Sequence, residues 1–170
     1  MMNLSDMNIL AREPDWAREH KEFFEWAPSK SLLASIRRYQ RAQKKSLLSR
    51  FVIKNIAVIQ YRFWSVVTGA DIPINTQIGG GLMLPHPNGI VIHPDVNIGP
   101  NCLILQQVTI GSLNSGGTPA IGGHVDIGAG AKLLGAIIIG DHAKIGANAV
   151  VLIDVPAHKV AVGVPARILA

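Results

Sequence analysis

The sequence predicts a mainly β fold, a left-handed parallel β-helix of hexapeptide repeats preceded by an N-terminal α-helical segment. Three observations lead to this fold class. Aliphatic residues recur every six positions after residue 71, a glycine often follows them, and the residues before position 71 show a helical period instead. Hydrophobic residues make up 48% of the 170 residues but aromatic ones only 5%, which favours a narrow core of small, repeated layers.

Residues 1–70 are expected to form the helical segment. The stretch 16–26 mixes charged and aromatic residues at helical spacing, and 29–45 carries an apolar stripe. A third helix is predicted over 46–68, ended by Gly69. Its stripe, which must face the core or a partner, consists of Leu48, Val52, Asn55, Ile56, Ile59, Phe63 and Val67.

This helical segment is also basic. It holds 12 Lys and Arg against 6 Asp and Glu, whereas residues 71–170 hold 4 against 5. No acidic residue lies between Trp26 and Ala70, where nine basic ones do. Such a block suits contact with anionic lipid or a phosphate-bearing substrate, or is simply a solvated helix face. Because no recognition motif accompanies the charge, nucleic acid is not an expected partner.

Residues 71–170 are predicted to form the β-helix domain. A period of six fits neither the helical period of 3.6 nor the strand period of two. It fits a triangular coil of three short strands and three turns, stacked about 4.8 Å apart. The rule breaks at 85–91 and at 111–120. The positions that obey it are Ile72, Ile78, Leu84, Ile92, Ile98, Ile104, Ile110, Ile121, Ile127, Leu133, Ile139, Ile145 and Val151.

Both interruptions are candidate functional loops, since regular repeats build the scaffold. In the first, His86 lies between two prolines, a rigid turn that fixes the imidazole. Histidine can take a proton from a hydroxyl near neutral pH, and a carboxylate would orient it. Asp71, fifteen residues earlier and so close to one coil away, is the candidate carboxylate. An ordinary turn histidine fits the spacing equally well.

Longer sequence motifs are more specific than the repeat period alone. The segments GADIP, IGGGLMLPHPNGIVI, IGAGAKLLG, GDHAKIGANAVVL and VGVPARI resemble the serine acetyltransferase family of hexapeptide acyltransferases over roughly 68–168. The resemblance implies an enzyme that transfers acetyl from acetyl-CoA directly to a hydroxyl, with no permanently bound cofactor. It implies His86 as general base and Asp71 as its orienting partner. It also implies a homotrimer, with a hexamer possible, and a CoA groove between neighbouring subunits.

The same resemblance assigns donor-binding positions. Backbone groups at Gly111, Ala129 and Ala147 would line the pantetheine arm, and Lys144 and Arg167 would contact phosphate. Solvated surface charge is the alternative explanation of the two cations.

The sequence departs from the family in the second loop. Thr118 stands where the family has a second histidine, and Gly117 stands where an arginine would hold the serine carboxylate. His93 lies near the position of a family glutamate. Thr118 and His93 are therefore the candidate acceptor-binding residues. The losses point to a sugar or polysaccharide precursor as acceptor, with free serine as the alternative.

Two further classes of function stay open, a zinc enzyme and a non-catalytic scaffold. A zinc enzyme like the γ-class carbonic anhydrases would need three histidines, and His86 with His93 lacks an evident third, so no metal is expected. A non-catalytic β-helix scaffold is the other. Cys102, the only cysteine, fits a buried hydrophobe. With no apolar leader visible, the protein is expected in the cytoplasm, with the inner face of the membrane as an open alternative.

Overall fold

A computed structural model describes residues 11–22, 24–43, 46–114 and 116–169, apart from the Leu48 side chain. Its helices are the 3-10 helix η1 (Trp16–Glu19), α2 (Pro28–Ala42) and α3 (Leu47–Thr68). The strands are β1 (Gln77–Ile78), β2 (Val91–Ile92), β3 (Asn97–Ile98), β4 (Leu103–Ile104), β5 (Thr109–Gly111), β6 (Ala120–Ile121), β7 (Asp126–Ile127), β8 (Lys132–Leu134), β9 (Ile138–Ile139), β10 (Lys144–Ile145), β11 (Val150–Val151), β12 (Val160–Val162) and β13 (Arg167–Leu169).

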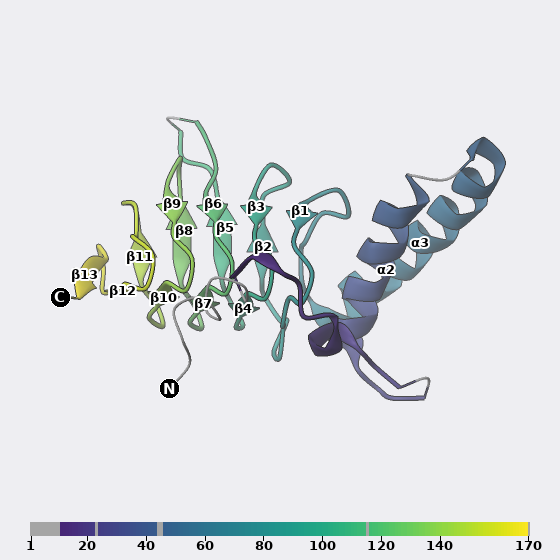
Figure 1. The fold of residues 1–170 in the computed structure, drawn as a ribbon, viewed down its shortest axis with the longest axis horizontal. Coiled ribbons are helices and arrows are strands. Elements are labelled where there is room, and N and C mark those ends of the chain that lie inside the picture. Colours follow the sequence, from purple (N-terminus) through teal and green to yellow (C-terminus); the bar gives the residue numbers. More distant parts are fainter. Residues whose placement is uncertain (1–10, 23, 44–45, 115, 170) are drawn as a thin grey trace.

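These strands form the predicted β-helix. They fall into three sheets with the orders β1-β3-β6-β9, β13-β12-β10-β7-β4 and β11-β8-β5-β2, and every pairing except β12 with β13 is parallel. Each of the middle coils contributes one strand to each sheet, and the coils stack along one axis (Figure 1). All the predicted aliphatic positions are buried, from Ile72 to Val151. The mainly β fold class with N-terminal helices is therefore confirmed.

Glycine follows the aliphatic residue because the coils approach closely there. A Cβ added at Gly99 would lie 2.5 Å from the carbonyl carbon of Gly122 on the next coil. At Gly128 it would lie 2.6 Å from the backbone nitrogen of Ala147. Neither glycine has a positive φ, so the requirement is for space and not for an unusual backbone conformation.

The helical segment differs from the expectation at its start. Among the described residues of 16–26, only the single turn η1 is helical, and the segment 11–19 lies as a strap from the β-helix to the base of the hairpin (Figure 1). Asp15 N–H donates to Asn101 Oδ1, and Asn101 Nδ2 donates to the carbonyl of Glu13. Contacts with residues far along the chain replace the local helix that the spacing predicted. The parts of 1–70 outside the described residues are 1–10, Phe23, Lys44, Lys45 and the Leu48 side chain.

Helices α2 and α3 form a hairpin that extends from the first coil (Figure 1). Pro28 at the start of α2 suits a first helical position, and Gly69 ends α3 in the left-handed conformation with φ 64°. One cation of the basic segment is structural. Arg37 is 5% exposed and pairs with Glu19 at 2.8 Å, which ties the hairpin to the strap and the first coil. No described helix has the length and apolar character needed to cross a membrane.

Candidate active site

His86 lies in the turn between the first and second coils. Two backbone hydrogen bonds hold the C-terminal end of this turn, from Gly89 N–H to the Gly69 carbonyl and from Asp71 N–H to the Ile90 carbonyl. The side chain is exposed, and a cavity of about 380 Å³ adjoins it. Its walls come from three elements: the start of α2, the end of α3 and the turn itself, through Pro28, Ser29, Val67, Thr68, Pro85, His86, Pro87 and Asn88. The volume suits a small acceptor.

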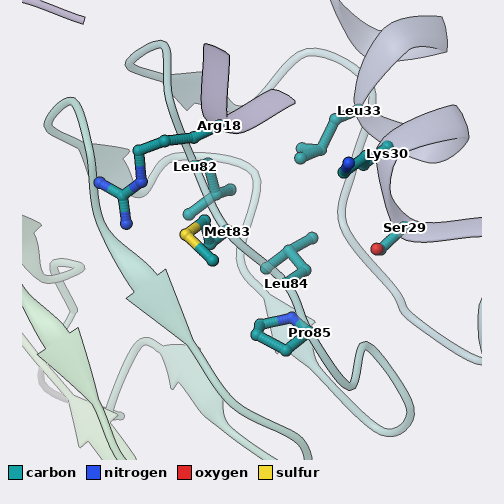
Figure 2. A pocket seen from close by; sticks show the side chains of 8 residues that line it. All are labelled: Arg18, Ser29, Lys30, Leu33, Leu82, Met83, Leu84 and Pro85. Atoms are coloured by element: carbon teal, nitrogen blue, oxygen red, sulfur yellow. The ribbon is translucent and has the colours of Figure 1, made fainter. Parts of the chain in front are cut away.

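A smaller hollow of about 110 Å³ adjoins this cavity and shares Ser29 and Pro85 with it. Its floor is a row of apolar side chains from Leu82 to Pro85, with Arg18 to one side and Lys30 on the other (Figure 2). Both cations have partners, because Arg18 donates to the Asn101 carbonyl and Lys30 pairs with Glu25. The hollow extends the apolar surface beside the His86 cavity.

Asp71 opens the first coil and is exposed. Its backbone bridges to Val91, not to His86, because the extra residues at 85–91 lengthen this coil to twenty residues. Among the described residues, no hydrogen bond or ion pair within 4.0 Å joins Asp71 to His86. The Asp71 charge acts on Tyr61 of α3. Burial in the first place, and then the Asp71 charge, raise the pKa of the Tyr61 hydroxyl. The sequence analysis did not connect Tyr61 with Asp71.

Two of the candidate donor-binding residues meet in one groove. Ala129 and Ala147 lie on the corner of the prism that also carries the His86 turn. Backbone hydrogen bonds run up this corner, from Gln107 N–H to the Asn88 carbonyl and from Asn148 N–H to the Ala129 carbonyl. The groove there has a volume of about 390 Å³, and its lining consists of Gln106, Gln107, Ala129, Gly130, Lys132, Ala147 and Asn148.

The other donor candidates lie elsewhere on the surface of the single chain. Gly111 ends β5, at the far end of the strand from the groove. Lys144 lines a separate cavity beside three histidines, and Arg167 lies in β13, paired with Val162. The cation that does line the groove is Lys132, whose Nζ donates to the Gln107 carbonyl at 2.6 Å. Lys132 directly precedes the buried Leu133, so its side chain points outward. This position in the repeat is the sequence signal that could have identified Lys132.

The two acceptor candidates share Asp95 as a neighbour. The Thr118 hydroxyl donates to the Asp95 carbonyl at 3.0 Å, and the Asp95 N–H donates to His93 Nδ1 at 3.3 Å. His93 follows β2 and Thr118 follows β5, whereas His86 precedes β2. Neither residue lines the His86 cavity of the same chain.

The remaining repeat histidines form a column on another corner. His124 and His142 stack with ring centroids 4.8 Å apart, and His142 and His158 stack at 5.0 Å. All three have positive φ, which marks them as corner residues. Within the described residues, no group of three or more His, Cys, Asp or Glu side chains could hold a metal ion.

The fold defines the class: the chain is a β-helix built from hexapeptide repeats. It resembles the serine acetyltransferase family, as the motifs predicted. A serine acetyltransferase of Helicobacter pylori is 44% identical over 104 residues, which cover 59% of this chain and 61% of that protein. The Escherichia coli K12 serine acetyltransferase is 50% identical over 108 residues, covering 62% of this chain and 40% of that protein.

Solved structures of serine acetyltransferases are also similar to this chain. A serine acetyltransferase in complex with CoA superimposes with a TM-score of 0.70 at 37% identity, over 85% of this chain and 58% of that one. The soybean enzyme complexed with serine gives a TM-score of 0.65 at 36% identity, over 84% and 56%. No protein-family model matches the chain. The chain thus spans between two fifths and about three fifths of the length of these relatives.

Proposed function

We propose that the protein is an acetyl-CoA-dependent O-acetyltransferase with His86 as general base. The observation that carries the proposal is that the His86 turn and the groove of Ala129 and Ala147 lie on one corner of the prism. Coils rise by about 4.8 Å each, so this corner forms a straight track from Ala147 past Ala129 to His86. A long, linear acyl carrier laid along the track would present its thioester beside the imidazole.

The chemistry follows from that placement. The His86 imidazole takes the proton of the acceptor hydroxyl as its oxygen attacks the thioester carbonyl carbon. An ester bond forms, the carbon–sulfur bond breaks, and the CoA thiolate leaves and receives the proton from His86. The acetyl group passes directly to the acceptor, so no acyl-enzyme is required. Asp71 stabilises the imidazolium, acting as a positioning residue once donor and acceptor are bound.

Small side chains explain how the track admits the donor. Ala129 and Ala147 leave the backbone of the corner open to a ligand, and a larger side chain would fill the groove. Lys132 supplies a cation there, and Lys144 and Arg167 are proposed to contact the phosphates at the donor's far end. By the resemblance of the motifs, Gly111 is also proposed to line the pantetheine arm.

Serine is the acceptor that the comparisons favour, because the relatives and matched structures described above are serine acetyltransferases, one of them holding serine. This reverses the order expected from the sequence, where a sugar came first. Gly117 and Thr118 still favour a sugar, since neither side chain carries a positive charge that could form an ion pair with a carboxylate. The Thr118 hydroxyl already donates to the Asp95 carbonyl. A sugar or polysaccharide precursor therefore remains the second hypothesis.

A homotrimer would explain why the candidate residues are spread over one chain. Gly111, His93 and Thr118 lie at the opposite edge of the β2–β5 sheet from His86. A neighbouring subunit would bring its own copies of these residues to the His86 corner. We further propose a cytoplasmic location, with contact between the basic hairpin and anionic lipid as a separate prediction. Retention of all the protein in the soluble fraction after flotation with anionic liposomes would refute that contact.

The test is a turnover screen. Release of the CoA thiol from acetyl-CoA is followed with serine and with a panel of sugars and sugar nucleotides as acceptors. The proposal expects acceptor-dependent release, with serine fastest. Preference for a sugar would select the second hypothesis, and no release with any acceptor, together with no CoA binding, would reject the transferase.

A further inference from the structure

A cavity of about 390 Å³ lies where α2 and α3 meet the loop that follows η1. We call it the hairpin cavity, and it is lined by Lys21, Glu22, Ser31, Ala34, Ser35, Arg38, Gln60 and Trp64. These residues are different from those that line the His86 cavity and the donor groove. Ser31 and Ser35 lie one turn apart on α2 with Ala34 between them, so small side chains leave the space open. Its volume suits a small molecule.

The Ser31 hydroxyl is the first observation that points to a ligand in this cavity. Ser31 is 7% exposed, and it lines the cavity. The neighbouring Ser35 hydroxyl donates to the Leu32 carbonyl at 2.6 Å, but within the described part of the chain the Ser31 hydroxyl makes no hydrogen bond. A buried hydroxyl without a partner costs free energy, so such groups are usually paired in a folded protein. A ligand in the hairpin cavity would supply the missing partner.

The two cations that line the cavity are also without an acidic partner. Lys21 Nζ donates to the backbone carbonyls of Glu22 and Glu25, both at 3.1 Å, and these are neutral acceptors. One nitrogen of the Arg38 guanidinium donates to Gln60 Oε1. Across the described residues, neither cation has a carboxylate oxygen within 4.0 Å. Both positive charges are therefore available to an anion.

This set of donors identifies the class of anion. An ammonium, a guanidinium, an amide and a hydroxyl around one space favour a group with several acceptor oxygens, and a phosphate monoester offers more of them than a carboxylate. Glu22 is the acidic residue of the lining, and its carboxylate lies 3.5 Å from His20 Nε2. The hairpin cavity thus presents more positive than negative charge.

Trp64 gives the cavity an aromatic wall. The rings of Trp26 and Phe63 meet the Trp64 ring at interplanar angles of 60° and 77°, so neither of them lies parallel to it. A ring on the ligand can pack against such a wall while its phosphate reaches the cations. The wall therefore favours a ligand that is larger than inorganic phosphate.

We propose that the hairpin cavity binds a small phosphate monoester that carries a ring, with the phosphate on Lys21, Ser31 and Arg38 and the ring against Trp64. The basic helical segment would then serve a soluble ligand. Lipid headgroups carry phosphate too, but a recessed hydroxyl and an aromatic wall suit a molecule that enters the cavity whole. The inference does not rest on the proposed transferase activity, and its tests do not use turnover.

Calorimetry with phenyl phosphate tests the proposal on the full chain. The wild type should bind this probe, and Arg38→Met should weaken the affinity by about tenfold or more, because a charge-assisted hydrogen bond is lost. Arg41→Met removes the same charge from an exposed position of α2 outside the cavity, so this matched control should bind as the wild type does. Ala34→Trp should abolish binding by filling the cavity, whereas Ala129→Trp, in the donor groove, should leave it unchanged.

Ser31→Ala distinguishes a ligand-binding hydroxyl from a structural one. It should weaken the affinity for phenyl phosphate by about threefold or more. The free energy of unfolding should stay the same or rise, since the hydroxyl has no partner to lose. Absence of binding to the wild type, or equal affinities of the wild type, Arg38→Met and Ala34→Trp, would overturn the proposal. Uptake by phosphatidic acid vesicles that Arg38→Met abolishes, without phenyl phosphate binding, would assign the cations to lipid and overturn it as well.

Discussion

Replacement of Arg37 by methionine should destabilise the fold far more than the same change one residue later. Arg37 Nε and Nη2 donate to the two carboxylate oxygens of Glu19 at 3.0 and 2.8 Å. Its other donors go to Gln40 and to the carbonyls of Ile78 and Gly79. The side chains of Arg37 and Glu19 are 6% and 9% exposed, so the Arg37→Met change would leave a buried carboxylate unpaired. Breaking such a pair costs about 3–5 kcal/mol.

The measurement is urea unfolding at a fixed protein concentration, with Arg38→Met as the control. Arg38 is exposed, and its loss should change the free energy of unfolding by about 0.5 kcal/mol or less. Adding Glu19→Leu to Arg37→Met should recover part of the loss, since the carboxylate is then removed too. Equal effects of the Arg37 and Arg38 replacements would refute the inference that this pair ties the hairpin to the β-helix.

Three further predictions concern the site and the core. Ala129→Trp should weaken CoA binding in calorimetry by filling the groove, whereas Ala34→Trp, at an exposed position of α2 outside the lining, should not; equal affinities would contradict the donor track. Asp71→Asn should lower kcat by less than His86→Ala does, and an unchanged kcat would remove Asp71 from the mechanism. Burial raises the pKa of the Cys102 thiol from 9.0 to about 12, so the folded protein keeps a proton that the unfolded chain loses. Stability should fall between pH 9 and 12 by up to about 1.4 kcal/mol per pH unit, and Cys102→Ala should flatten that fall; identical slopes would contradict it.

The period of six was sufficient to predict the β-helix, because each aliphatic residue must repeat the environment of its equivalent one coil away. The same counting could also have placed Ala129 and Ala147 on the His86 corner. It misjudged which residue lies opposite Asp71, because the extra residues before Val91 shift the register by two and Asp71 pairs with Val91. A rule based on spacing alone cannot show how insertions between repeats change the register.

Other features depend on contacts that no local pattern encodes. The strap replaces a helix because Asp15 and Glu13 bond to Asn101, 86 and 88 positions away. Arg37 looked like its neighbours in the basic segment, and only the position of Glu19 makes it structural. The separation of His93 and Thr118 from His86 follows from which end of a strand each occupies, and this was not apparent before the sheets were defined.

The assignment of His86 as general base is tested by removing its imidazole. Initial rates of CoA release from acetyl-CoA with serine are compared for wild type and His86→Ala, after calorimetry has shown that both bind CoA equally. Loss of a general base lowers the rate by about 10²–10⁴-fold, and the account predicts a fall of that size. A His86→Ala variant that binds CoA and transfers acetyl at the wild-type rate would contradict the assignment of His86 as the base.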